Sequence, residues 1–580
     1  MKDLIPDKDL PNWKDLLEEG KKIAQGIQIG TNGFDMHRDQ SFFDWYLNEI
    51  INGNIIFFPQ LGLKSVDEQE KGIKKLYEGF QKAGIDLGAV MITAGLLNGI
   101  PPEARELVPK GTSYVYNGLK DYGRIVHAAP VFAAIADYAV GCPNSVENVT
   151  NALTAGCFGV GTLSQFSWRF PYWDDEVGQI AETVKSMGII AAKRNEMASV
   201  GSYAEDGIPS TFIDHASLVG YTLIEQYITE TLCGAAYTVG FGGLMSNIVD
   251  KFACMLAINE AARIDEFSPV IDHVEGNTIE VSKDMAANYG LVVSDFMIFA
   301  LLERKYKTGA MYTPKPVSEA IRVPTVEEVI DAAAACKASM PRVLEIEDAN
   351  LFDDTQILEL KDKLVINGKK FYDNAMNGLA DMGVDIEDPV QMLLALRRLG
   401  AEQLEMKFNP GKKDSSQYRG FMSTALTAKQ KKYENQVEDT LALLKDADLM
   451  DAVKGKKIVV GSADTHQFAL FVMSEVLNRL GAKVINAGVD RDPEHLLDLA
   501  AQEKTSLIAV SIHNGQCVDW VKTFTENNMT RHQNAQLYVG GVLNTMLDSS
   551  SEPVDATDIL KEIGATPCAD VIELIRMIGQ

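Results

Sequence analysis

Residues 455–580 alternate between short apolar runs and longer segments that are apolar on most faces. Residues 457–461 predict a buried strand, and residues 468–480 predict a helix that Gly481 ends. The alternation predicts further strands at 483–485, 506–510, 536–539 and near 565. It predicts helices at 493–502 and 570–577, and another that follows the strand at 506–510 and ends at about residue 527. Five parallel strands favour a flavodoxin-like, doubly wound (Rossmann-type) α/β domain with strand order 2-1-3-4-5.

Residues 51–395 carry a similar alternation over a longer stretch. Strand-like runs occur at 54–58, 88–93, 136–141, 159–162, 188–192, 236–239, 269–271 and 310–312. Eight such runs predict an α/β chain with a TIM-like (β/α)8 barrel, whose active site lies at the carboxyl ends of its strands. Residues 1–50 are interpreted as an N-terminal helical extension. Residues 396–454, with a charged helix at 427–447, are interpreted as a linker.

Composition narrows the class of protein. The 580 residues contain 81 acidic and 54 basic side chains, a net charge of −27, which disfavours nucleic acid and anionic membranes as partners. The seven cysteines include no Cys-x-x-Cys pair, as is typical of reduced thiols in a cytoplasm. No signal-peptide core and no uncharged apolar run of about 18 residues is present. We therefore expect a soluble, cytoplasmic protein.

Polar and glycine residues follow three strands of the predicted C-terminal sheet. In the order 2-1-3-4-5, the first, third and fourth strands are neighbours, so their carboxyl ends form one rim where open α/β sheets bind ligands. The residues at these ends are Asp464 and His466, then Ser511 and Gly515, then Gly540 and Gly541. An Asp-x-His step alone usually marks a surface loop, and a glycine pair commonly only turns the chain. Their arrangement on neighbouring strands favours a binding site.

This set of residues resembles a known family. Asp464-Thr-His466-Gln-Phe-Ala469 is similar to the Asp-x-His-x-x-Gly signature of base-off/His-on cobalamin-binding domains. The resemblance implies that His466 binds cobalt as the lower ligand and that Asp464 fixes its imidazole. It also implies that Ser511, Gly515 and the Gly540-Gly541 pair contact the cofactor. Two positions depart from the family: Ala469 stands where glycine is preferred, and His513 where leucine is usual.

The predicted barrel resembles the catalytic subunit of glutamate mutase and the related 2-methyleneglutarate mutase. The matching pieces are Gly141-Cys-Pro143, Phe170-Pro-Tyr172, Val239-Gly-Phe-Gly-Gly243 and residues 312–325. The resemblance implies adenosylcobalamin as the cofactor, with Lys315 and Glu319 binding the hydroxyls of the adenosyl ribose. A Lys–Glu step of four residues is otherwise an ordinary helical surface pair. The position after a predicted strand favours the binding role.

Four further residues are the candidates for substrate binding: Thr162, Trp168, Arg169 and Tyr172. In glutamate mutase the acid that meets the substrate's ammonium aligns with Thr162, and an arginine aligns with Ala139. A site built for an ammonium would be left unpaired without that acid, so the resemblance implies a small dicarboxylate without an amine.

A dicarboxylate needs cations. The arginines near predicted strand ends are Arg38, Arg124, Arg169 and Arg194. Arg169 is the first choice because it lies among aromatic residues and a guanidinium binds a carboxylate with two hydrogen bonds. An arginine stacked on Trp168 for structural reasons is the alternative.

The resemblance implies an adenosylcobalamin-dependent radical carbon-skeleton isomerase. The expected reaction converts 2-methyleneglutarate to 3-methylitaconate, in a homo-oligomer, dimer or tetramer, without nucleic-acid or membrane partners. Three alternatives stay open: a glutamate mutase-like enzyme on another small diacid, a corrinoid-dependent methyltransferase, and a non-catalytic cobalamin-binding protein. Methyl-transfer corrinoid proteins usually carry a four-helix cap before the cobalamin domain, and the one predicted helix at 427–447 is less than that.

Overall fold

The computed structural model describes residues 4–6, 9–105, 115–170, 173, 175–263, 270–282, 284–319, 323–411, 426–464, 467–489, 491–513, 517–545 and 554–580. The chain divides into two compact units. The first comprises Met1–Glu280, Ala286–Pro316 and Thr325–Leu426, and the second comprises Val281–Met285, Val317–Pro324 and Thr427–Gln580. The finer boundaries near 50, 395 and 454 stay predictions.

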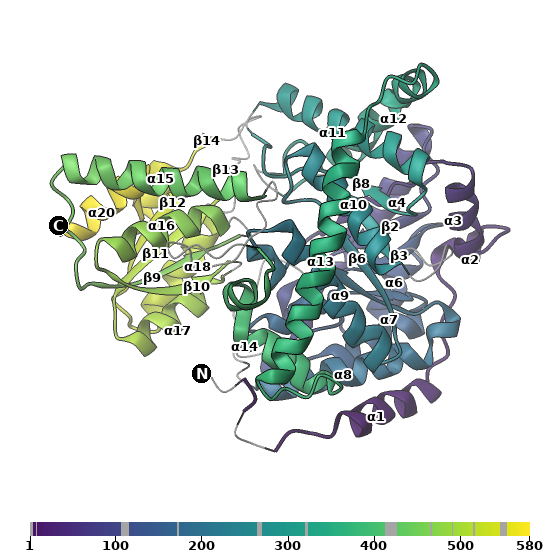
Figure 1. Cartoon of the computed structure of the whole chain (residues 1–580), viewed down its shortest axis with the longest axis horizontal. Helices are drawn as coiled ribbons and strands as arrows, with labels where there is room; N and C mark the ends of the chain where they lie inside the picture. Colours follow the sequence, from purple (N-terminus) through teal and green to yellow (C-terminus); the bar gives the residue numbers. More distant parts are fainter. Residues whose placement is uncertain are drawn as a thin grey trace. The chain divides into compact units, whose positions relative to one another are not determined.

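The first unit contains an eight-stranded parallel sheet, nearly barrel-shaped, in which the strands follow one another in sequence order (Figure 1). The strands are β1 (Gln60–Leu61), β2 (Ala89–Ile92), β3 (Phe132–Ile135), β4 (Gly159–Val160), β5 (Ser199–Tyr203), β6 (Ala236–Phe241), β7 (Ile271–Glu275) and β8 (Met311–Thr313). The first and last strand regions meet at a parallel bridge between Phe57 and Tyr312. There the Phe58 amide donates to the Tyr312 carbonyl and the Tyr312 amide donates to the Ile56 carbonyl, both at 2.8 Å.

Helices surround this sheet. They are α1 (Trp13–Gln25), α2 (Gly33–His37), α3 (Phe42–Ile51), α4 (Val66–Lys82), α5 (Pro102–Arg105), α6 (Leu119–Val126), α7 (Ser145–Ala155), α8 (Glu176–Ala192), α9 (His215–Gln226), α10 (Ile248–Ala262), α11 (Met285–Tyr306), α12 (Val326–Asp348), α13 (Thr355–Asp381) and α14 (Pro389–Phe408). A strand followed by a helix is the repeating unit from β2 onwards, as expected for a (β/α)8 arrangement.

Two of the predicted strands were wrong. Residues 136–141 form the loop after β3, where Tyr138 has φ +57° and Gly141 has φ +80°, values that a strand does not allow. Residues 188–192 are the end of α8 rather than a strand. A Cβ at Gly188 would lie 2.6 Å from the Leu17 carbonyl oxygen, so this glycine permits close packing of α8 on α1. The fifth strand is instead Ser199–Tyr203.

The amino end of the barrel is closed by apolar side chains. Phe58, Phe132 and Met311 from the barrel form one buried cluster with Phe42 and Trp45 of α3. The Phe42 and Phe132 rings stack with centroids 4.7 Å apart. The first predicted strand, at 54–58, therefore supplies core residues, and the hydrogen-bonded strand β1 begins just after it. Apolar side chains therefore fill the amino end of the barrel, and the polar side chains of the candidate site lie at its carboxyl end.

One helix in the described part of the chain, α11, is long and apolar enough to cross a membrane by length and composition alone. Its apolar window has a mean hydropathy of 1.6 and is 44% buried within the protein. Phe296 and Phe299 of this helix pack against Tyr312 of β8, with ring centroids 5.2 and 4.9 Å apart. Such packing is what a helix of the barrel's outer ring requires, and a single helix of this kind is weak evidence for a membrane span.

The second unit contains a five-stranded parallel sheet in the order β10-β9-β11-β12-β15 (Figure 1). The strands are β9 (Lys457–Ser462), β10 (Lys483–Gly488), β11 (Leu507–Ile512), β12 (Gln536–Gly541) and β15 (Thr566–Pro567). The helices are α15 (Leu426–Asp446), α16 (Gln467–Arg479), α17 (Pro493–Glu503), α18 (Cys517–Thr530), α19 (Thr557–Glu562) and α20 (Val571–Gly579). A small antiparallel pair, β13 (Asn544–Thr545) and β14 (Val554–Asp555), follows β12.

Both faces of this sheet are buried. Ile458 and Val460 of β9 join a cluster with residues of α16 and α20, whereas Val459 between them joins a cluster with residues of α17 and α18. An apolar run with no polar alternation is what a parallel strand covered on both faces needs. The predicted positions of the five strands agree with the structure, and so does their order.

Candidate functional site

The carboxyl end of the barrel is built around a buried ion pair. Glu275 ends β7, and Lys315 follows β8 by two residues. Lys315 Nζ lies 2.9 Å from Glu275 Oε1 and donates to Gln60 Oε1 of β1 at 2.8 Å. Glu275 Oε2 accepts a hydrogen bond of 2.8 Å from the Tyr203 hydroxyl at the end of β5. Burial alone would raise the pKa of Glu275, but the charges of Lys315 and His273 outweigh it and lower that pKa.

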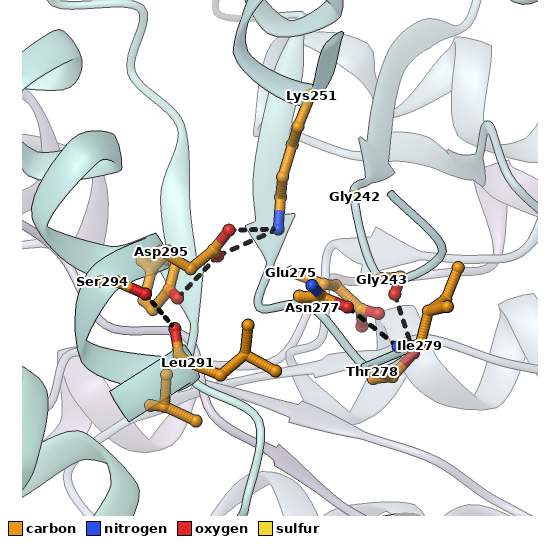
Figure 2. A network of polar contacts seen from close by, with 12 residues as sticks. Gly242, Gly243, Lys251, Glu275, Asn277, Thr278, Ile279, Leu291, Ser294 and Asp295 are labelled. Atoms are coloured by element: carbon orange, nitrogen blue, oxygen red, sulfur yellow. Dashed lines mark hydrogen bonds and ion pairs between the residues drawn. The ribbon is translucent and has the colours of Figure 1, made fainter. Parts of the chain in front are cut away.

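A second carboxylate organises the loop after β6. Glu205 Oε2 accepts from the Gly242 and Leu244 amides at 2.6 and 3.2 Å and lies 3.2 Å from the oxygen of the Tyr203 hydroxyl. Gly242 has φ +108°, a conformation that favours glycine, and this brings its amide to the carboxylate. The neighbouring Gly243 carbonyl accepts from Thr278 after β7, as Figure 2 shows. The loops after β5, β6 and β7 are thereby held together around Glu275.

A fully buried ion pair supports this side of the barrel from outside (Figure 2). Lys251 of α10 donates to Asp295 of α11 at 3.2 and 3.0 Å, and the Tyr312 hydroxyl of β8 donates to the same carboxylate at 3.0 Å. Each charge has its counter-charge and a hydrogen bond, which is the condition under which buried ions are tolerated. This pair ties α10 and α11 to β8.

Two more carboxylates lie at the ends of β3 and β5, beside Thr162. Asp206 accepts from Ser164 Oγ at 3.0 Å and from Trp168 Nε1 at 3.1 Å. Asp137 accepts from Gln165 Nε2 at 3.3 Å. Burial, followed by the charge of Asp206, raises the pKa of Asp137 to about 7, and burial raises that of Asp206 to about 6. The rim is therefore richer in acids than the sequence alone suggested.

A histidine lies deeper in the barrel beneath Glu275. His273 Nδ1 lies 2.8 Å from Asp272 Oδ1, and the ring is packed between Phe58 and Tyr203, with centroids 5.6 and 6.0 Å away. Burial opposes the charge on His273, but Asp272 and Glu275 raise its pKa above the usual value. Its Nε2 atom is buried and makes no hydrogen bond within the described part of the chain.

The two residues predicted to bind the adenosyl ribose, Lys315 and Glu319, both follow β8 in the chain. Lys315 belongs to the polar rim and is buried. Glu319 lies in a turn four residues later, and neither residue is in a helix. The alternative of an ordinary helical surface pair is therefore wrong.

The predicted substrate residues have mixed outcomes. Thr162 is buried, and its hydroxyl donates to the Ala136 carbonyl at 2.6 Å. Trp168 is half-buried and tied to Asp206, whereas Arg169 is exposed rather than enclosed by aromatic residues. Tyr172 lies outside the described residues. The loop after β4 therefore brings Thr162 and Trp168 to the rim and leaves the Arg169 side chain accessible to solvent.

The other three arginines do not lie at the carboxyl end of the barrel. Arg38 pairs with Asp86 at 2.8 Å, and Asp86 precedes β2. Arg124 of α6 pairs with Asp67 and Glu70 of α4 in the helical layer. Arg194 lies between α8 and the start of β5. Their expected position at the substrate-binding end of the barrel was wrong, because an apolar run reveals a strand without revealing which loop lies at which end.

In the second unit the rim residues after β9 and β11 are joined through Asp464. Asp464 Oδ1 accepts from Ser462 Oγ at 3.0 Å, and Oδ2 accepts from the His513 amide at 2.6 Å. Ser511 Oγ lies 3.3 Å from His513 Nδ1. β9 and β11 are neighbours although β10 separates them in sequence, so Asp464 lies where the strand order reverses. Open α/β sheets bind ligands at this switch point.

The glycine pair at the end of β12 differs in its two members. A Cβ at Gly541 would lie 2.2 Å from the Ile512 carbonyl oxygen, and Gly541 has φ +108°. A Cβ at Gly540 would meet nothing nearer than the Cys568 carbonyl oxygen at 3.4 Å. Gly541 is therefore required for β12 to approach the end of β11, whereas a Cβ at Gly540 would make only an ordinary contact.

Two predicted cofactor residues, His466 and Gly515, lie outside the described residues. Their neighbours Asp464, Ser511, Gly540 and Gly541 are described and lie at the ends of three adjacent strands, as predicted. Among the described residues, no group of three or more His, Cys, Asp or Glu side chains could hold a metal ion by itself. A metal bound by one protein side chain and an organic ligand does not need such a group.

Sequence reasoning missed several rim residues. Tyr203, Glu205 and Asp206 were overlooked because β5 was placed inside α8, and Asp137 was overlooked because β3 was placed too late. His273 and Glu275 occupy alternate positions of a strand whose predicted end fell at residue 271. Polar residues at the end of an apolar run were the signal that correct strand boundaries would have exposed.

Comparison with known proteins adds little to this geometry. No family model matches the chain, and no curated protein matches it. Among solved structures, a novel cobalamin-binding protein from Desulfitobacterium hafniense aligns with 12% sequence identity and a TM-score of 0.18. The alignment covers 21% of this chain and 58% of that protein. At this TM-score the likeness carries no argument about fold or ligand.

Proposed function

We propose that the chain is an adenosylcobalamin-dependent carbon-skeleton isomerase. In this proposal the second unit is a flavodoxin-like domain that binds the cofactor through His466, and the barrel holds the substrate. The observation that carries the proposal is the position of Asp464. This residue is a buried carboxylate at the switch point between β9 and β11, fixed by Ser462 and the His513 amide, two residues before His466.

The described residues fit such a cofactor. Asp464 is held as an acceptor at the rim by Ser462 and the His513 amide, and an ionised carboxylate is the type of group that accepts a hydrogen bond from an imidazole N–H. A carboxylate behind a metal-binding histidine fixes the ring orientation and raises its basicity. We assign Asp464, Ser511, Gly540 and Gly541 to the cofactor site, with His466 and Gly515.

The barrel residues have positioning roles in the proposal. Adenosylcobalamin, when bound, supplies a carbon-centred radical by homolysis of its cobalt–carbon bond. Lys315, held by Glu275 and Gln60, is proposed to bind the adenosyl ribose together with Glu319. A buried polar rim orients the substrate and keeps water away from reactive species.

The proposed substrate is a small dicarboxylate, with conversion of 2-methyleneglutarate to 3-methylitaconate as the named candidate. The support from the chain is Thr162, whose hydroxyl is committed to the Ala136 carbonyl and offers no negative charge to an ammonium. Asp137 and Asp206 lie nearby, so the absence of an amine is the part of the proposal that most needs a direct test.

The test uses the full-length protein with adenosylcobalamin under anaerobic conditions. 2-Methyleneglutarate, glutamate and glutarate are each added, and products are followed by NMR while cob(II)alamin is followed by its absorption spectrum. The proposal expects rearranged product and cob(II)alamin with an unsaturated or branched diacid. Methyl transfer from methylcobalamin without any rearranged product would instead support the methyltransferase alternative and overturn the isomerase.

A further inference from the structure

The barrel rim has few cations for an anionic substrate. Among the described residues at the ends of its strands, the cationic groups closest to Glu275 are Lys315 and His273. Lys315 is already paired with Glu275 and Gln60. The arginines predicted for this role lie in the helical layer, at the amino end or on the surface. The question is therefore which group could receive a carboxylate inside the barrel.

His273 is the group with a buried polar atom to offer. Its side chain is 8% exposed, and its Nε2 atom makes no hydrogen bond within the described residues. The nearest carboxylate oxygen, Glu275 Oε1, is 3.9 Å away, too far for a hydrogen bond. Leaving a buried donor without an acceptor carries the full desolvation penalty of that group. Such an atom inside a barrel rim indicates a partner that arrives with a ligand.

The surroundings of the ring fix its orientation. Nδ1 faces Asp272 Oδ1 at 2.8 Å, so the second nitrogen points away from Asp272. A Cβ at Gly240 would lie 2.0 Å from Cε1 and 2.4 Å from Nε2, so the ring occupies space that only glycine at position 240 leaves open. Tyr203 stacks on the ring and Phe58 meets it edge-on, with centroids 6.0 and 5.6 Å away. A ring held in this way is a rigid donor rather than a mobile one.

The charges around His273 come from three elements. Asp272 and Glu275 belong to β7, Lys315 follows β8, and the Tyr203 hydroxyl comes from β5. The charge of Glu275 is offset by Lys315, and Asp272 offsets an imidazolium. Burial opposes the protonated ring, but the two carboxylates raise the pKa of His273 above its usual value of 6.5. When the ring is protonated, both nitrogens carry hydrogen and Nε2 is a charged donor.

We propose that Nε2 of His273 donates a hydrogen bond to a carboxylate oxygen of the substrate, so that the Asp272–His273 pair takes the place of an arginine in the barrel. His273 is thus a positioning and specificity residue of the proposed isomerase. The inference rests on the proposed function for the reaction, but binding at this site requires neither cobalamin nor turnover.

The probes are glutarate, a five-carbon diacid that cannot rearrange in this way, and 1,5-diaminopentane, its cationic counterpart of the same length. Binding to the full-length protein without cofactor is measured by calorimetry. Wild-type protein should bind glutarate in preference to the diamine. The affinity for glutarate should fall as pH rises through the raised pKa of His273, because the protonated ring is the form that donates.

The variants separate a binding role from a structural one. His273→Leu should weaken glutarate binding by about tenfold to a hundredfold, the usual effect of losing a hydrogen bond to a charged group. It should also reduce the pH dependence to the part that the Asp137 and Asp206 carboxyls contribute. His273→Gln places an amide N–H near the position of Nε2 and should restore part of the affinity with the same reduced pH dependence. His127→Leu, at the end of α6, is the matched control and should bind as wild type does.

Failure of the inference is distinguishable from failure of the isomerase. Preferential binding of the diamine, absence of glutarate binding by wild-type protein, or equal glutarate binding by wild type and His273→Leu would each overturn the role of His273. Gly240→Ala gives a second route, since it displaces the ring without removing it and should reduce glutarate binding as His273→Leu does. Rearrangement of a substrate in the cobalamin assay tests the proposed function independently of these results.

Discussion

Replacing Gly541 by alanine tests the packing at the carboxyl ends of β11 and β12. Gly540→Ala, on the adjacent residue, is the matched control. At position 541 the new methyl group would lie 2.2 Å from the Ile512 carbonyl oxygen and 3.0 Å from that residue's carbonyl carbon and amide nitrogen. That carbonyl also accepts the Val542 amide at 2.8 Å. Neither backbone group is the end of a flexible side chain, so the strand end itself must shift.

The expected cost has two parts. A non-glycine residue in a sparsely populated backbone region costs about 1–3 kcal/mol. Overpacking that displaces backbone adds about 1–3 kcal/mol. We therefore expect Gly541→Ala to lower the free energy of local opening at the ends of β11 and β12 by about 2–6 kcal/mol. Gly540→Ala, whose methyl group would meet ordinary contact distances, should cost less than about 1 kcal/mol.

Hydrogen exchange of the full chain, read by mass spectrometry on peptides covering 507–512 and 536–541, measures this opening directly. Exchange should accelerate in both peptides for Gly541→Ala and stay close to wild type for Gly540→Ala. Cobalamin affinity should fall with the first variant for the same reason. Equal exchange in the two variants would refute the argument that Gly541 sets the approach of β12 to β11.

Three further predictions concern charges at the two rims. Asp464→Asn should lower cobalamin affinity by about 10–100-fold in a spectroscopic titration, and an unchanged affinity would exclude a supporting role behind His466. Glu275→Gln leaves Lys315 buried without its counter-charge and should lower the free energy of unfolding by about 3–5 kcal/mol in urea. Glu327→Gln, which breaks an exposed ion pair with Lys75, should change the free energy of unfolding by less than about 1 kcal/mol. Similar losses of unfolding free energy in the two variants would contradict the importance of burial. Thr162→Glu should depress turnover of a diacid. Wild type should disfavour glutamate by more than about 10⁴-fold, and comparable kcat/KM values for glutamate and 2-methyleneglutarate would refute the assignment of substrate.

The second unit could be predicted from sequence because its strands are short, β-branched and covered on both faces. Residues 457–461 and 506–510 leave no competing helical interpretation, and their order followed from the alternation of strand and helix. In the barrel the same reasoning failed at α8, whose buried end is apolar on all sides and contains Gly188. A glycine that allows two helices to approach looks, in sequence, like a glycine that bounds a strand.

The site was predictable only in part. Lys315 was found through a resemblance that fixes its position relative to a strand. Its partners Glu275 and Gln60 lie 40 and 255 residues away in the chain, and nothing in local sequence indicates such a contact. His273 was missed for the same reason, since an unpaired buried nitrogen is a property of the packed barrel. The arginines were misplaced because hydropathy does not distinguish the two ends of a barrel.

Electron paramagnetic resonance of the cob(II)alamin form tests the central claim most directly. Protein labelled with ¹⁵N-histidine and reconstituted with cobalamin should show the superhyperfine splitting of one axial imidazole nitrogen, a doublet in place of the unlabelled triplet. His466→Gly should lose this splitting, since the cobalt then lacks its protein ligand. A splitting that is unaffected by histidine labelling, or that persists in His466→Gly, would show that another group binds the metal and would contradict the assignment of the second unit as a His-on cobalamin domain.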